Sequence, residues 1–151
     1  GPVLVAEAGA TGWTCEAQFV PEDSPEAAIT GAGPVHVLAP GVLERVASTQ
    51  QPQAPLAIVA RPSGRSVKAV LVEAEWVLVL DRIADPGNLG TILRSAEAAG
   101  VDAIVLTPGS VDPYNPKVVR ASAGALFHVP VVEADIAEVA AAGFELVVSR
   151  S

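Results

Sequence analysis

Two short segments of this chain combine an Asn with basic residues, which suits an anionic ligand. Residues 85–94 read DPGNLGTILR and residues 112–120 read DPYNPKVVR, so both begin with the pattern Asp-Pro-x-Asn. The guanidinium of Arg94 is suited to binding a phosphate or polarising a hydroxyl, and the amide of Asn88 can hydrogen-bond a ligand. These two side chains are our first candidates for chemistry.

Each candidate also has an ordinary structural interpretation. Asn88 and Asn115 are well placed to cap the helices that follow them, and Pro116 supports capping by Asn115 because Pro favours the first helical position. Arg94 would then simply pair with Glu97, three residues later on the same helix. Capping and ion pairing therefore stand as alternatives to ligand binding.

Glycines and further basic residues near these turns favour a ligand. Gly87 and Gly90 flank Asn88 and would let a substrate backbone approach closely, which capping alone does not require. Basic residues near both turns would form a local basic surface at one sheet edge, with structural ion pairs as the alternative for each: Arg82, Arg94, Lys117 and Arg120.

An alternation of strands and helices is expected to position both turns. The apolar run 76–80 predicts a central parallel strand that is covered on both faces. Later strands are expected at 103–106, 127–132 and 144–148, and helices at 88–99, 116–123 and 136–142. This order predicts an α/β fold with an open parallel sheet and right-handed crossovers. Ligands bind such sheets at the carboxyl ends of the strands, where both turns would lie.

The first part of the chain predicts a separate small α/β module over residues 1–65. Its expected helices and strands are short: 3–10, 13–20, 35–39, 40–47 and 56–60. A stretch with Pro, Gly and Ser at 61–66 marks the best linker candidate. We place the domain boundary between about 61 and 75, with a linker at 66–75 and the second domain at 76–151.

Composition narrows the classes of function. The net charge of −8 has the wrong sign for a general nucleic-acid binder, so RNA binding would require a local basic patch. Cys15, His36 and His128 lack the spacing of metal ligands, and we expect no metal. No apolar run is long enough for a membrane span, and no signal peptide is recognisable at the start. A single Cys fits a reducing compartment, and we expect a cytoplasmic protein.

The two turns resemble the signatures of a known family. Residues 85–100 read DPGNLGTILRSAEAAG, and residues 112–130 read DPYNPKVVRASAGALFHVP. These segments are similar to the first and second signatures of the SpoU-type (TrmH-like) RNA ribose 2′-O-methyltransferases, which belong to the SPOUT class with its α/β-knot domain. Residues 1–8 and 52–59 resemble the ribosomal-protein-like RNA-binding module that often precedes that domain.

The resemblance implies methyl transfer from S-adenosylmethionine to a ribose 2′-hydroxyl of rRNA or tRNA. It implies that Asn88 and Arg94 line the active site and that the Arg helps to activate the hydroxyl. We therefore take both as the catalytic residues and expect Arg82, Lys117 and Arg120 to bind RNA. The resemblance also implies a homodimer in which the catalytic domains meet near the active site.

One part of the family pattern is missing from these 151 residues. The third signature, a Gly-Asn-Glu-like turn followed by Ser-Leu-Asn, supplies most of the cofactor pocket and the knot in the family. We therefore expect an incomplete C-terminal part and cofactor-binding residues beyond Ser151. The chain alone is expected to be inactive and not to bind S-adenosylmethionine.

Two alternatives remain. A non-catalytic RNA-binding or assembly module would keep the basic sheet edge and end naturally at Ser151. An ordinary doubly wound nucleotide enzyme is disfavoured, because no G-x-G-x-x-G follows any of the expected strands.

Overall fold

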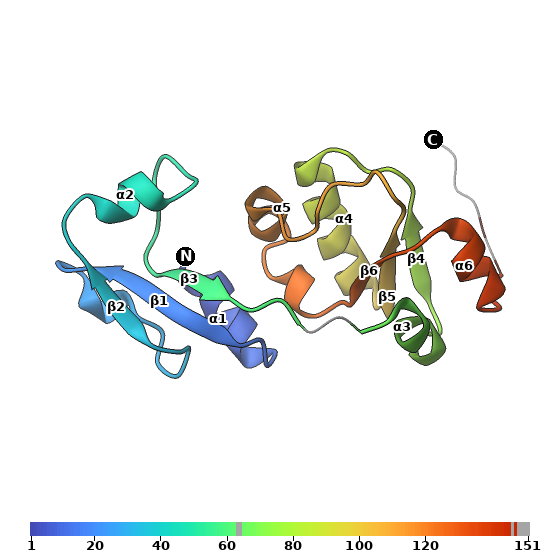
Figure 1. Cartoon of the computed structure of the whole chain (residues 1–151), viewed down its shortest axis with the longest axis horizontal. Coiled ribbons are helices and arrows are strands. Elements are labelled where there is room, and N and C mark those ends of the chain that lie inside the picture. The colour runs from blue at the N-terminus through green and yellow to red at the C-terminus, as the bar shows by residue number, and fades with distance from the viewer. Residues whose placement is uncertain (63–64, 146, 148–151) are drawn as a thin grey trace. The chain divides into compact units, whose positions relative to one another are not determined.

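The structure is a computed structural model that describes residues 1–62, 65–145 and 147. The chain divides into two compact units, Gly1–Gly64 and Arg65–Ser151, and each is considered by itself (Figure 1). No helix among the described residues is both long and apolar enough to cross a membrane.

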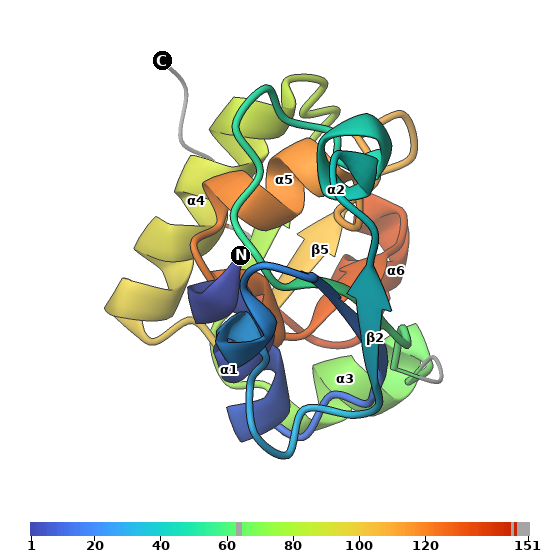
Figure 2. The ribbon, with the colours of Figure 1, turned by 90° about the vertical axis from the view of Figure 1, so that its left-hand side faces the viewer.

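The first unit is a three-stranded sheet with the order β2-β1-β3, accompanied by short helices. Strand β2 runs parallel to β1, and β3 runs antiparallel to it. Helix α1 packs beside β1 and β3 (Figure 2). The elements are α1 (Pro2–Ala10), β1 (Cys15–Pro21), η1 (Pro25–Ala27), β2 (Val35–Leu38), α2 (Val42–Val46) and β3 (Leu56–Val59).

One face of β1 holds the centre of the first unit. Gln18 and Val20 are fully buried, whereas their neighbours along the strand are partly exposed, as the alternation of a strand requires. The buried carboxamide of Gln18 is satisfied by the following loop: it donates to Ile29 O at 2.9 Å and accepts from Ile29 N–H at 2.8 Å. These bonds fix that loop against the sheet.

The second unit is an α/β layer whose sheet has the order β4-β5-β6, with all three strands parallel. This architecture confirms the fold class predicted from the alternating pattern. The elements are α3 (Val67–Glu73), β4 (Val77–Leu80), α4 (Pro86–Ala99), β5 (Ala103–Leu106), α5 (Pro116–Ala121), η2 (Ala125–Phe127), β6 (Val131–Glu133) and α6 (Ile136–Ala141).

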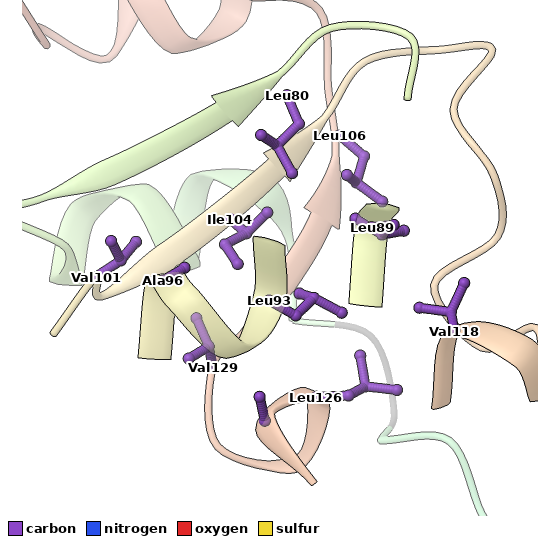
Figure 3. Close-up of a cluster of buried hydrophobic side chains, with 11 residues drawn as sticks. Leu80, Leu89, Leu93, Ala96, Val101, Ile104, Leu106, Val118, Leu126 and Val129 are labelled. Atoms are coloured by element: carbon purple, nitrogen blue, oxygen red, sulfur yellow. The ribbon is translucent and has the colours of Figure 1, made fainter. Parts of the chain in front are cut away.

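Helices cover both faces of this sheet. Ile104 and Leu106 of β5 pack against Leu89 and Leu93 of α4 on one face, together with side chains from α5 and η2 (Figure 3). Val105 points to the opposite face and packs in a cluster with residues of α3 and α6. Each fully buried Leu contributes about 1.5–3 kcal/mol through removal of apolar surface from water.

The structure corrects three expectations about the elements. Strand β4 lies at one end of the described sheet, and the central strand is β5, all four residues of which are buried. The segment expected as a linker at 66–75 contains α3, whose Val70 and Leu71 are buried. Phe127 belongs to η2, so the strand expected from 127 begins only at Val131. The strand expected at 144–148 lies partly outside the described residues.

Candidate functional site

The candidate site lies at the carboxyl edge of the β4-β5-β6 sheet, where two loops are joined by hydrogen bonds. The loop 81–85 follows β4 and the loop 107–115 follows β5. Thr107 N–H donates to Leu80 O at 3.0 Å, and Val111 N–H donates to Ile83 O at 2.8 Å. The two sequence motifs therefore begin side by side, as the parallel-sheet interpretation predicted.

Helix α4 is capped by Asp85 rather than by Asn88. Asp85 Oδ1 accepts the backbone N–H of Asn88 at 2.7 Å, and Pro86 occupies the first helical position. The expectation that Asn88 caps this helix is wrong, because the Asp-Pro pair starts the helix earlier. Asn88 lies inside the first turn and is exposed. Its side-chain amide makes no hydrogen bond within the part of the chain that the structure describes.

The second turn uses the same pattern differently. Asn115 Oδ1 accepts the N–H of Lys117 at 2.9 Å and caps α5, with Pro116 at the first helical position. Asp112 Oδ1 instead accepts the N–H of Tyr114 at 2.9 Å and closes a tight turn before the cap. The capping interpretation is therefore confirmed for Asn115, which leaves Asn88 as the amide available to a ligand.

Arg94 is exposed on α4, roughly 9 Å along the helix axis from Asn88 at a rise of 1.5 Å per residue. Its expected partner, Glu97, instead lies 3.8 Å from Nε2 of His128. Among the described residues Arg94 forms no ion pair. The hydroxyl of Thr91 donates to Gly87 O of its own helix at 3.0 Å, and among the described residues it accepts no hydrogen bond from the Arg94 guanidinium.

The remaining basic candidates lie on the loops and helices around this edge. The side chain of Arg82 is 76% exposed, and its guanidinium is 3.4 Å from a carboxylate oxygen of Asp81. Lys117 and Arg120 are exposed on α5, which directly follows the second loop. The structure thus brings Arg82 and the start of α5 to one edge, whereas Arg94 lies further along α4.

Gly90 serves helix packing, and its expected role in substrate approach is wrong. It is buried, and a Cβ built on it would lie 2.3 Å from Ala121 Cβ and 2.9 Å from Ser122 N of the segment packed against it. Only a glycine lets α4 and α5 approach this closely. Gly87 is exposed, and the position beside Asn88 stays accessible.

Sequence reasoning missed Asp81 and Thr107. Thr107 Oγ1 donates to Asp81 Oδ1 at 2.8 Å, and this bond, followed by the bond from Arg82, holds the pKa of Asp81 below its usual value. The two residues are 26 positions apart, so no local pattern reveals their contact. No group of three or more His, Cys, Asp or Glu that could hold a metal occurs among the described residues.

Known proteins similar to this chain point to one family. Residues 75–148 match the model of the SpoU rRNA Methylase family. The 23S rRNA (guanosine(2553)-2′-O)-methyltransferase RlmP of Bacillus subtilis is 39% identical over 101 residues, which cover 67% of this chain and 39% of that protein. The mouse mitochondrial rRNA methyltransferase 3 is 59% identical over 56 residues, which cover 37% of this chain and 13% of that protein.

Solved structures agree with the sequence matches. The SpoU methyltransferase AviRb from Streptomyces viridochromogenes, in complex with AdoMet, has a TM-score of 0.75 at 26% identity; the match covers 93% of this chain and 55% of that one. An AdoMet-bound rRNA methyltransferase from Sinorhizobium meliloti has a TM-score of 0.75 at 28% identity and coverages of 94% and 55%. This chain thus spans little more than half the length of these neighbours.

Proposed function

Because its second unit belongs to the SpoU rRNA methylase family, we propose that this chain is part of an RNA 2′-O-methyltransferase. The complete protein would transfer a methyl group from S-adenosylmethionine to a ribose 2′-hydroxyl of rRNA or tRNA. The observation that carries the proposal is the availability of Asn88 and Arg94 on α4. Neither side chain has a structural task among the described residues, and both lie within the matched segment.

The chemistry assigned to these side chains follows from their properties. Transfer to a ribose would break the bond between the methyl group and the sulfonium sulfur as the new O–C bond forms, leaving a neutral thioether, and the 2′-hydroxyl proton would pass to solvent water. A guanidinium beside the 2′-oxygen favours the developing negative charge, and Arg94 would supply it. Side chains of a helix lean toward its N-terminus, so Arg94 leans toward the turn that holds Asn88. The Asn88 amide then orients the ribose by hydrogen bonding.

The described residues do not fit the cofactor by themselves. S-adenosylmethionine would supply the methyl group from its sulfonium. At the ends of β4 and β5, however, the polar groups bond to one another: Thr107 donates to Asp81 and accepts from the N–H of Arg82. These polar groups are therefore not free to hold an adenosine. We assign no cofactor-binding residue within this chain and place that pocket on other segments of the longer protein.

RNA binding is assigned to the basic edge and the first unit. Arg82, Lys117 and Arg120 would contact phosphates, since all three are exposed near the carboxyl edge. We further propose that residues 1–65 form an RNA substrate-binding module. That module contains three basic residues, Arg45, Arg61 and Arg65, against six acidic ones, so its contacts would rely on shape more than on charge. A homodimer and a cytoplasmic location belong to the same proposal.

The test uses the longer protein that contains this chain. We expect Arg94→Ala and Asn88→Ala each to abolish transfer of labelled methyl groups to rRNA, with the free energy of unfolding changed by less than about 0.5 kcal/mol. The matched control is Asn115→Ala, which removes a helix cap, lowers stability by about 1 kcal/mol and leaves the transfer chemistry intact.

Two outcomes would reject parts of the proposal. Full methyl transfer by Arg94→Ala would show that Arg94 is an ordinary surface residue with no role in catalysis. Tight RNA binding with no methylation by the unchanged longer protein would favour the non-catalytic RNA-binding module.

A further inference from the structure

We propose that Thr107, oriented by Asp81, is a positioning residue that holds Arg82 in the geometry with which it contacts RNA. The inference rests on the proposed function, because it concerns how one RNA contact of that site is built. It adds two residues, from the ends of two different strands, to the site.

The hydroxyl of Thr107 joins two consecutive residues after β4. Thr107 is 5% exposed, and its Oγ1 accepts the backbone N–H of Arg82 at 2.9 Å while donating to Asp81 Oδ1 at 2.8 Å. A carboxylate can only accept, so Asp81 accepts the hydrogen bond of the hydroxyl, which leaves a lone pair of Thr107 Oγ1 facing the N–H of Arg82. The charge on Asp81 thereby sets the direction of both bonds.

The backbone of Arg82 requires such support. Its φ is +49°, in the left-handed region that residues with a Cβ rarely adopt and that costs roughly 1–2 kcal/mol. Non-glycine residues in this region persist only where surrounding contacts hold them, and they gather at functional sites. The bond from the N–H of Arg82 to Thr107 supplies one such contact, and the bond from Val111 N–H to Ile83 O fixes the next residue.

The position that results is suited to a phosphate contact. Gly109, in the loop after β5, lies beside the stem of Arg82: a Cβ built there would make ordinary van der Waals contact with Arg82 Cγ, at 3.7 Å. The guanidinium contacts Asp81 at 3.4 Å, but both side chains are largely exposed. An exposed pair of this kind is weak, so a phosphate can replace the carboxylate as partner of the guanidinium.

The experiment measures binding of this 151-residue chain to a fluorescein-labelled 20-nucleotide RNA hairpin by anisotropy at several salt concentrations. We expect Arg82→Ala to weaken binding and to reduce the slope of log K against log salt by about 0.7–0.9, the loss of one phosphate contact. Thr107→Val should reproduce at least half of that loss in log K. Thr107→Ser, which keeps the hydroxyl, should restore binding.

A double-variant cycle separates positioning from general damage. Thr107→Val in the Arg82→Ala background should cause no further loss, because the residue being positioned is gone. An equal loss in both backgrounds, or unchanged binding by Thr107→Val, would overturn the proposal. Should Thr107→Val fail to fold, Arg82→Gly serves instead. It relieves the left-handed strain and should raise stability while weakening RNA binding, and unchanged binding by that variant would overturn the proposal as well.

Hydrogen exchange distinguishes failure of this inference from failure of the proposed function. The N–H of Arg82 should exchange slowly in the unchanged chain and fast in Thr107→Val, whether or not RNA binds. Slow exchange of this N–H in both the unchanged chain and Thr107→Val would show that Thr107 does not hold the backbone of Arg82. Protection by Thr107 together with no RNA binding by the unchanged chain would instead reject the RNA-binding function.

Discussion

Two serines of the second unit show how a single hydroxyl changes stability. The Oγ of Ser110 is buried and has no hydrogen-bond partner among the described residues. The Oγ of Ser122, which belongs to a fully buried residue, donates to Val119 O at 2.9 Å. A buried hydroxyl without a partner keeps its desolvation cost, whereas a paired one recovers it.

We therefore predict opposite effects of removing these hydroxyls. Ser110→Ala should raise the free energy of unfolding by about 1 kcal/mol, and Ser122→Ala should lower it by about the same amount. Urea unfolding followed by the fluorescence of Trp76, in a Trp13→Phe background, measures both. A loss of stability in Ser110→Ala would show that its hydroxyl has a partner in solution.

The lowered pKa of Asp81 gives a prediction on pH. Its hydrogen bond from Thr107, followed by that from Arg82, keeps the pKa below the ordinary value of 3.8 in the folded chain. The ionised carboxylate therefore stabilises the fold above pH 3.8, and this contribution is lost as the pH falls through the folded-state pKa. The stability difference between the unchanged chain and Thr107→Val should narrow as the solution is acidified below 3.8.

Thr107→Ser is the control for this titration, since it keeps the hydroxyl and should follow the unchanged chain at every pH. Urea unfolding at a series of pH values and an NMR titration of the Asp81 carboxyl provide the two measurements. A difference that does not vary with pH would mean that the Thr107–Asp81 bond does not favour the ionised form.

At the scale of elements, the close approach of α4 and α5 depends on Gly90. A methyl group there would lie 2.3 Å from Ala121 Cβ and 2.7 Å from the Ala121 carbonyl carbon, so the helices must separate. We predict that Gly90→Ala lowers the free energy of unfolding by roughly 1–3 kcal/mol, although Ala is the better helix former. Urea unfolding checks the value.

A compensating change sharpens this prediction. Ala121→Gly removes the side-chain contact but leaves the carbonyl carbon at 2.7 Å, so the double variant should recover only part of the lost stability. A Gly90→Ala chain as stable as the unchanged one would show that the helices move apart at no cost.

At the scale of the whole molecule, the two units have the same net charge, but the second unit contains most of the basic residues. Residues 1–64 carry two basic and six acidic side chains, and residues 65–151 carry seven basic and eleven, so each unit has a net charge of −4. Neither unit attracts RNA by its overall field. The proposed RNA contacts therefore rely on a few exposed basic residues rather than on the net charge of either unit.

We predict a shallow salt dependence for RNA binding by this chain. Three phosphate contacts, from Arg82, Lys117 and Arg120, give a slope of log K against log salt of about −2 to −3. Lys117→Ala should make this slope shallower by about 0.7–0.9, the contribution of one phosphate contact. Arg45→Ala, in the first unit, should leave it unchanged, because that side chain already donates to Gly41 O at 3.2 Å. A slope that depends equally on Arg45 would place the RNA contacts elsewhere.

The sequence alone predicted the features that depend on neighbours along the chain. Helix α4 ends at Gly100, which adopts a left-handed φ of 77°, and Asn115 caps α5, because caps and stops involve residues within one turn. The alternation of apolar runs with amphipathic segments predicted the parallel α/β layer, because burial of each face repeats with a local period. Asn88 and Arg94 were identified through motifs of the same local kind, and their catalytic role stays a prediction.

Only the tertiary structure decided which strand is central, what Gly90 packs against and how the site edge is held. Strand β5 is central because β4 and β6 pair with its two sides. An apolar run has the same sequence pattern whether its strand lies at the edge or at the centre of a sheet. Gly90 meets Ala121 from another helix, and Thr107 meets Asp81 from another strand. Such contacts join residues about 30 positions apart, so folding in three dimensions, rather than any local pattern, selects them.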